Sequence, residues 1–475
     1  MNTFKKTTLY TALAGIGAFG MAGTASAVHV NADGLGQVLI YPYYTVNAQN
    51  GNALGVAPFN SLLSVVNSTT SGKAVKVRFL EGKNSQEVLD FNLYLSPRDV
   101  WTAAIVPTGD GAGIFTADKS CTTPSVSTDP ANPVAFVNYQ YAGDSGGDGL
   151  DRTREGYIEI IEMGNVTGVT LAAITHVAGV APCTAAALSD AVAQGNTVLG
   201  NGGLFGGITL VNVLAGEAFT ADAVALEAFR TVAPAIWAAP GVTTPDLTFA
   251  LPPQTEIFNG TTATTYGFAQ GIDAVSAALM HNTLMNEYVL DAATKSGTDW
   301  VVTFPTKKFY VNSVSAAPPF QRPFINGTSC DDISVATFDR EERSVTITTG
   351  FSPPRPQSPL SLCYEANVVT FKGGNILGSA NSFDITAANL PAGAEHGWAL
   401  FDFTKTLGGN TVTAHALESI SPQATFNGLP VIGFAVQSFV NGTLGSGVNL
   451  LQSNYGGNFV HKTTRSITEA VVPAR

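Results

Sequence analysis

The chain has 475 residues, of which 12% are charged, and its formal net charge at pH 7 is −12. This length allows two or three domains with a substantial core. Nucleic acids and anionic membranes bind clustered lysine and arginine, whereas between Arg154 and Lys295 the only basic side chain is Arg230. The composition argues against both partners and leaves cations, sugars and other copies of the chain as candidates.

The first 27 residues have the pattern of a secretory signal peptide. Lys5 and Lys6 form a positively charged start, an apolar stretch runs from Leu9 to Ala22, and Ala25-Ser26-Ala27 is a small-residue cleavage site. No later segment offers an uninterrupted apolar run of membrane-spanning length. We therefore expect an exported chain that begins at Val28 and has no transmembrane segment.

Four cysteines follow the predicted cleavage site, and an even number in an exported protein favours two disulfides. Three pairings are possible. We favour the sequence neighbours, Cys121–Cys183 and Cys330–Cys363, because each pair brackets one region. The spacings do not resemble a set of zinc ligands.

Residues 28–115 carry the clearest secondary-structure signal. Stretches rich in β-branched and aromatic residues cover 36–46, 60–69, 73–82 and 88–96. In the last two stretches apolar and polar residues alternate, which is typical of strands with one face in water. We expect an antiparallel β-sandwich-like lobe here.

Residues 116–270 are expected to form a mixed lobe that contains the acidic, glycine-rich loop GDSGGDG. A strand is predicted at 155–164, followed by an alanine-rich helix that ends at Gly195. The segment 208–226 is interpreted as a hairpin that turns near residues 215–216.

Residues 271–475 are expected to form a β-rich C-terminal lobe. The apolar stripe in 273–290 predicts a helix. Strands are predicted in DWVVTFP, KKFYVN, CYEANVVTF, GWALFDFT and PVIGFAVQSFV. The expected fold class is mainly β with minor α, an α+β protein with a sandwich-like N-terminal lobe and further β-rich lobes.

The sequence GDSGG around Ser145 resembles the nucleophile loop of chymotrypsin-like serine proteases. The resemblance covers five residues only. Asp148 stands where that family has proline, and the only histidine between the predicted cleavage site and Ser145 is His29. A serine without a positioned base is a weak nucleophile, and His176 lies downstream. We interpret the motif as a flexible acidic turn and predict neither catalytic residues nor enzyme activity.

Asp144, Asp148 and Asp151 cluster among the glycines of this turn. Carboxylates on such a loop can present oxygen atoms to Ca²⁺, although the spacing is not that of an EF-hand. A solvated acidic loop is the favoured interpretation, and a calcium site is the alternative. No other cofactor is predicted.

Tyr41, Tyr43 and Tyr44 in IYPYYTV form a candidate stacking platform for sugars. Because Pro42 stands among them, the alternative is an edge strand whose rings pack on one end of the sandwich. We favour the packing interpretation and keep the platform as a candidate ligand site.

Several stretches together resemble an uncharacterised family of exported, surface-associated proteins of Gram-negative bacteria. They are GQVLIYPYYTV, VLDFNLYLSPRDVWTA, REGYIEIIEMG, TDWVVTFPTKKFYV and LCYEANVVTF. The resemblance spans most of the chain after the signal peptide and implies no activity or residue roles. It implies a location outside the cell, at the surface of a Gram-negative bacterium, or in the periplasm.

Export, an acidic and lysine-poor composition and many strands favour a structural protein of the cell surface or extracellular matrix. Such an S-layer-like protein would associate with copies of itself, assisted by Ca²⁺ between acidic loops. The alternative is a secreted module that binds glycans or another surface ligand. An extracellular hydrolase is less favoured, because no converging acid, base and nucleophile is visible.

Overall fold

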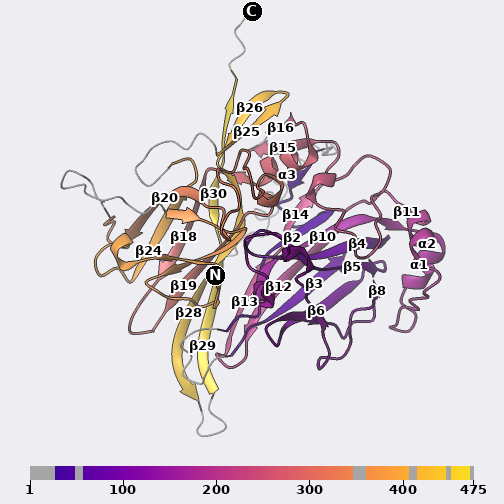
Figure 1. The fold of residues 1–475 in the computed structure, drawn as a ribbon, viewed down its shortest axis with the longest axis horizontal. Coiled ribbons are helices and arrows are strands. Elements are labelled where there is room, and N and C mark those ends of the chain that lie inside the picture. The colour runs from indigo at the N-terminus through magenta and orange to yellow at the C-terminus, as the bar shows by residue number, and fades with distance from the viewer. Residues whose placement is uncertain are drawn as a thin grey trace, which may run out of the picture.

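A computed structural model describes residues 27–48, 57–260, 262–345, 360–405, 415–444 and 451–470. The predicted signal peptide, apart from its last residue, lies outside the described residues. Within them the protein has a β-rich α+β fold with mostly antiparallel sheets and three short α-helices. Figure 1 shows an N-terminal half (27–250) in indigo to magenta beside a C-terminal half (251–470) that ends in yellow.

The largest sheet has eight strands in the order β1-β14-β2-β10-β4-β5-β8, with β11 paired to β10. Its outermost strands are only two or three residues long, and strands this short offer little edge for another chain to pair with. The strands are β1 His29–Val30, β2 Val38–Thr45, β4 Gly72–Glu81, β5 Glu87–Leu95, β8 Cys121–Thr123, β10 Glu155–Val166, β11 Thr197–Val198 and β14 Val224–Glu227.

A six-stranded sheet of order β13-β12-β3-β6-β7-β9 packs against the first one across an apolar core. This β-sandwich combines strands from residues 28–115 with strands from 116–270, which the sequence analysis placed in separate lobes. The strands are β3 Asn60–Asn67, β6 Val100–Thr108, β7 Gly111–Phe115, β9 Val134–Ala135, β12 Leu204–Asn212 and β13 Glu217–Asp222. The predicted hairpin at 208–226 is confirmed as β12 and β13.

Two five-stranded sheets, β21-β20-β24-β18-β30 and β23-β22-β19-β28-β29, build the C-terminal half. In β19 the side chain of Val301 joins the sandwich core, while Trp300 and Val302 join a second core. Alternate residues of a strand point to opposite faces, so this one sheet connects both cores. The strands are β18 Thr283–Val289, β19 Gly297–Thr303, β20 Asp331–Asp339, β21 Leu360–Leu362, β22 Ala366–Phe371, β23 Ser382–Ile385, β24 His396–Asp402, β28 Ile432–Leu444, β29 Leu451–Val460 and β30 Lys462–Thr464.

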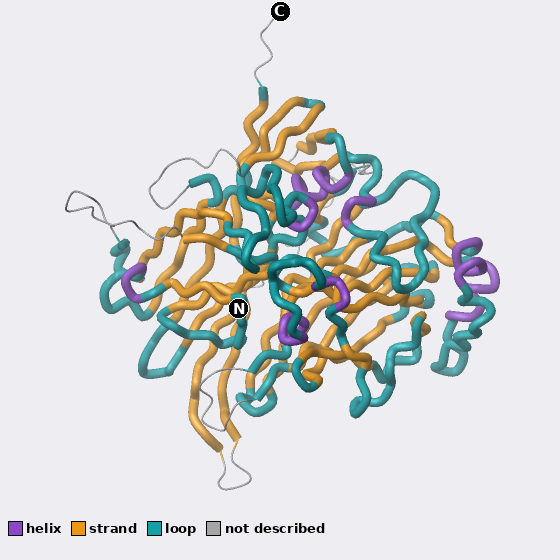
Figure 2. The backbone as a smooth tube through the Cα atoms, viewed as in Figure 1, coloured by secondary structure: helices purple, strands orange, loops and turns teal. Residues whose placement is uncertain are grey.

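Small sheets and short helices complete the fold, and Figure 2 shows how strands dominate both halves. The remaining strands are β15 Gln254–Asn259, β16 Thr262–Gly267, β17 Met280–His281, β25 Ala416–Ile420, β26 Gln423–Asn427, β27 Leu429–Pro430 and β31 Ser466–Glu469. The α-helices are α1 Gly168–Ile174, α2 Asp190–Gly195 and α3 Gly271–Leu279. The 3₁₀ helices are η1 Tyr139–Tyr141, η2 Leu150–Arg154, η3 Leu247–Phe249, η4 Lys307–Phe309 and η5 Ala387–Asn389.

The helix predicted over 273–290 is too long. α3 ends at Leu279, and the chain continues as β17 and β18. The buried residues Leu284 and Tyr288 are four positions apart, a spacing shared by a helical stripe and by one face of a strand. Arg465 donates hydrogen bonds to the Ala277 and Ala278 carbonyl oxygens and so caps the early helix end.

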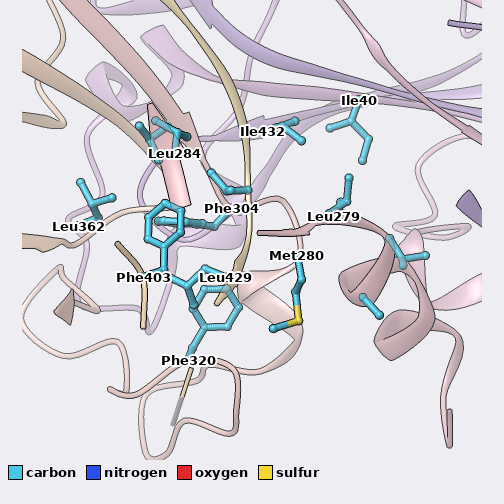
Figure 3. Packing of buried hydrophobic residues seen from close by; sticks show 14 of the residues in the cluster. Ile40, Leu279, Met280, Leu284, Phe304, Phe320, Leu362, Phe403, Leu429 and Ile432 are labelled. Carbon is cyan, nitrogen blue, oxygen red and sulfur yellow. The ribbon is translucent and has the colours of Figure 1, made fainter. Parts of the chain in front are cut away.

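The second core joins the two halves (Figure 3). Ile40 of β2 lies in the same cluster as Leu279 of α3 and Ile432 of β28. Phe304, which follows β19, packs edge-on against the ring of Phe320. The halves are thus held together by continuous apolar packing.

Both expected disulfides are confirmed, with the favoured pairing of sequence neighbours. Cys121–Cys183 ties β8 to the segment between α1 and α2. Cys330–Cys363 joins the start of β20 to the end of β21.

Candidate functional site

A polar pocket of about 620 Å³ lies where the two halves meet. One wall comes from Arg78 in β4, the β4–β5 turn and the loop at 140–144; the other comes from residues 307–313 and Glu365. Ligand sites are commonly concave, of this size, and placed between structural units. We call it the inter-half pocket.

Arg78 is held at the pocket by two glutamates on neighbouring strands. Its Nε donates to Glu87 on β5 at 2.7 Å, and its Nη1 donates to Glu159 on β10 at 2.5 Å. Glu159 stands directly opposite Arg78 in the β4–β10 ladder. Burial raises the pKa of both carboxyls, and the guanidinium opposes that rise. The three side chains form a buried ion-pair cluster.

The prediction that one face of β4 lies in water is wrong, because every residue of this strand is buried. Lys76 and Arg78 do point away from the sandwich core, but both are buried. A distant segment covers Lys76: its Nζ donates to the Ala239 carbonyl, and its partner Asp90 accepts from the Gly241 backbone N–H. Local alternation specifies which face a side chain takes, whereas a covering segment from elsewhere decides whether that face meets water.

Lys308 is the pocket cation without a partner. It follows Lys307, whose ammonium is paired with Asp331 at 2.7 Å. Among the residues the structure describes, Lys308 makes no hydrogen bond or ion pair; its Nζ lies 5.1 Å from the ring centre of Phe309. Burial lowers the pKa of Lys308 and the positive charge of Arg78 lowers it further, while the negative charges of Glu159, Asp246 and Glu87 act in the opposite direction.

Glu365 lines the same pocket and is almost completely buried. Its Oε2 accepts a 2.6 Å hydrogen bond from Ser85 Oγ, which also lies 2.8 Å from the hydroxyl of Tyr157. Burial raises the pKa of Glu365 to about 8. At neutral pH this carboxyl is therefore mostly protonated and adds little negative charge to the pocket.

The raised pKa of Glu365 predicts a pH-dependent stability. The folded state binds more protons than the unfolded chain between the unfolded pKa of 4.5 and the folded pKa of about 8. The free energy of unfolding should thus fall as pH rises through this interval, by up to about 1.4 kcal/mol per pH unit for one group. Glu365→Gln should show a smaller fall in urea denaturation between pH 5.5 and 8.5. Equal slopes for both proteins would contradict the assignment.

The acidic loop forms part of the pocket wall and is organised by Arg152. Its Nη1 and Nη2 donate to the two carboxylate oxygens of Asp144 at 2.8 and 3.0 Å. The guanidinium also lies 3.9 Å from the ring centre of Tyr141. Although burial alone would raise it, the pKa of Asp144 is lowered by hydrogen bonds from Arg152 and Asn84.

Ser145 connects the two halves and has no base beside it. Its Oγ accepts a 3.0 Å hydrogen bond from the Gly327 backbone N–H, and no histidine in the described ranges contacts it. His176 instead places Nδ1 3.0 Å from Ser96 Oγ and 3.6 Å from Asp99. Ser96 and Asp99 both contact the same ring nitrogen of His176. In a catalytic triad the serine and the aspartate contact opposite ring nitrogens, so this group does not have that arrangement.

The three aspartates proposed for calcium are not brought together as a metal site. Asp144 is engaged by Arg152, while Asp148 and Asp151 are exposed. No group of three acidic, histidine or cysteine side chains suited to a metal occurs in the part of the chain that is described. Calcium as a cofactor stays a prediction.

The sugar platform of Tyr41, Tyr43 and Tyr44 must be corrected, because all three rings are fully buried. Their hydroxyls donate to the Ser64 carbonyl, to Glu155 and to the Thr153 carbonyl, respectively. β2 is an inner strand between β14 and β10, not an edge. A bulge at Pro42 and Tyr43 accommodates the proline, which has no N–H to donate.

The sequence analysis did not predict that Lys308, Glu365 and Arg78 line one pocket. KKFYVN was predicted as a strand, but Lys307–Phe309 forms the 3₁₀ helix η4, which turns Lys308 into the pocket. The only available signal was an unusual concentration of lysines at 307–308 in a lysine-poor chain.

No protein-family model, curated protein or solved structure matches this chain. The resemblance to exported proteins of Gram-negative bacteria therefore stays a prediction. None of the helices described here has the length and apolar character needed to cross a membrane.

Proposed function

We propose that the protein binds a small anionic ligand in the inter-half pocket, with Lys308 as its principal contact. The observation that carries the proposal is the half-buried ammonium of Lys308 at the pocket wall, which has no hydrogen-bond acceptor among the described residues. Withdrawing a charge from water is costly unless a partner replaces the lost hydration. A bound carboxylate, phosphate or sulfate group supplies that partner.

The other cations that line the pocket are already engaged. Arg78 is paired with two glutamates, Lys307 with Asp331, and Lys83 donates to the Gly146 carbonyl oxygen. Lys308 is therefore the cation left for a ligand.

The carboxyls on the pocket wall oppose an anion less than their number suggests. Asp144 is neutralised by Arg152, and Glu365 is largely uncharged below pH 8. Asp246 accepts hydrogen bonds from the backbone N–H and hydroxyl of Thr248, which do not cancel its charge, so it is the wall carboxylate that still opposes an anion. A neutral Glu365 is thus part of what makes the pocket suitable for an anion near pH 7.

This function corresponds to the secreted binding module considered from the sequence, with an anionic ligand in place of a sugar on the tyrosines. Export and a surface location, predicted from the signal peptide, support access to ligands outside the cell. S-layer-like self-association stays a prediction.

Anion-dependent stabilisation tests the proposal. Sulfate, phosphate and citrate should raise the melting temperature above that in chloride of equal ionic strength. A ligand at ten times its Kd adds about 1.4 kcal/mol of stability. Lys308→Met should abolish this gain while folding normally, since it removes a charge that the fold disfavours.

Lys119→Met, at an exposed lysine outside the pocket, is the matched control and should keep the full gain. Equal stabilisation of wild type and Lys308→Met by all three anions would show that they act elsewhere, and would reject the proposal.

A further inference from the structure

A second hollow lies on the outer face of the six-stranded sheet, on the side opposite the sandwich core. It has a volume of about 590 Å³ and crosses strands β3, β6, β12 and β13. We call it the sheet groove. It involves none of the residues of the inter-half pocket.

Gly207 leaves the groove open. Residues Phe205, Gly207 and Thr209 of β12 share the outer face, because alternate strand residues point the same way. Gly207 does not have a positive φ, so its backbone conformation does not require glycine. Its neighbour Gly206 is different, since a Cβ there would come within 2.4 Å of the Tyr41 hydroxyl beneath the sheet.

The groove has the opposite charge character to the inter-half pocket. No lysine, arginine or histidine lines it, and Asp222 is its one ionisable residue. In the described part of the chain the Asp222 carboxylate has no hydrogen-bond or ion-pair partner. An anionic ligand would meet this carboxylate and no cation.

The lining combines apolar surface with hydroxyl groups. The side chains of Leu62 and Phe205 are 45% and 42% exposed, which is unusual for large apolar residues in one hollow. Thr209 and Thr220 place their hydroxyls 3.1 Å apart across the β12–β13 pair. A pyranose matches this lining, since its C–H face packs on an aromatic ring while its hydroxyls bond polar groups.

We propose that the sheet groove binds a neutral saccharide, with Phe205 beneath a sugar ring and Asp222 accepting hydrogen bonds from sugar hydroxyls. The volume falls within the range of small-ligand sites. The site is independent of the anion pocket and gives the chain a second ligand site with a different ligand chemistry.

The probe is a panel of neutral disaccharides (cellobiose, maltose, chitobiose and mannobiose) measured by saturation-transfer NMR and titration. At least one member should bind, and Phe205→Ser and Gly207→Leu should each weaken that binding at least tenfold. Gly207→Leu fills the groove, and its Cβ has one tight contact, 3.2 Å from the Ala221 carbonyl oxygen.

Val213→Ser, at a 75% exposed position on the same hairpin but outside the groove, should bind like wild type. Lys308→Met should also bind the sugar normally. Absence of binding by every panel member, or binding that survives both groove variants, would overturn the proposal. A solution dimer that Gly207→Leu dissociates would overturn it as well, by showing a second copy in the groove.

Discussion

Replacing Arg78 by methionine is expected to lower the free energy of unfolding by about 3 to 5 kcal/mol, the cost of breaking a buried ion pair from one side. The substitution leaves Glu87 and Glu159 buried without their guanidinium. Methionine fills much of the vacated volume, so the loss is mainly electrostatic. Urea denaturation of the two proteins at pH 7 measures it.

The pH dependence of the stability loss distinguishes buried carboxylates that have lost their ion-pair partner from a simple loss of packing. Burial already raises the pKa of both glutamates, and without Arg78 it rises further. A carboxyl whose pKa is raised in the folded state destabilises the fold least at low pH, where it is protonated. The loss in free energy of unfolding caused by Arg78→Met should therefore become smaller as pH falls from 7 to 5.

Arg343→Met is the matched control, because Arg343 also binds a carboxylate, Asp339 at 2.7 Å, but its side chain is 56% exposed. It should change stability little. A deficit for Arg78→Met that is no larger than this control, or that is constant with pH, would show that the buried cluster does not carry the stability assigned to it.

Removing the Cys121–Cys183 disulfide by a double alanine substitution is expected to cost about 4 kcal/mol, because the bond closes a long loop in the unfolded chain. The two cysteines are 62 positions apart. The segment it anchors carries α1 and α2, and its apolar packing is the small cluster around Ile174 and Leu188. Hydrogen exchange should therefore increase first in residues 168–195.

Cys330–Cys363, with a separation of 33 positions, is the matched comparison. Its removal should cost a similar amount, but it also frees the segments that carry Ser329 and Glu365 at the inter-half pocket. Only this second variant should lose anion-dependent stabilisation. A loss below about 1 kcal/mol for Cys121–Cys183, or loss of the anion effect in both variants, would contradict this account.

Much of the architecture could be predicted because it is encoded locally. Alternation in β4 and β5 and the β-branched stretch of β10 identify strands without any partner. The disulfide pairing followed from the position of the cysteines. The single helix predicted over 273–290 was wrong because the spacing of residues 284 and 288 fits both a helix and a strand. Where the helix ends depends on the cap from Arg465, almost two hundred residues away.

The candidate site could not be predicted in the same way, because its properties depend on burial by distant segments. Tyr41 was wrongly considered for a surface site, and Lys308 was not recognised as part of one. A cluster of tyrosines resembles a surface platform until β10 and β14 enclose it. A surface lysine becomes a half-buried pocket cation once the two halves close around it. The acidic loop was interpreted as a solvated turn, whereas Arg152 holds its Asp144 in the pocket wall.

The most direct test of the anion pocket is anomalous diffraction from crystals of the protein soaked in selenate. The account predicts an anomalous peak within hydrogen-bonding distance of the Lys308 ammonium, lined by Arg78 and Glu365, and no such peak in Lys308→Met crystals. Selenate bound only at exposed surface lysines, with none beside Lys308, would contradict it.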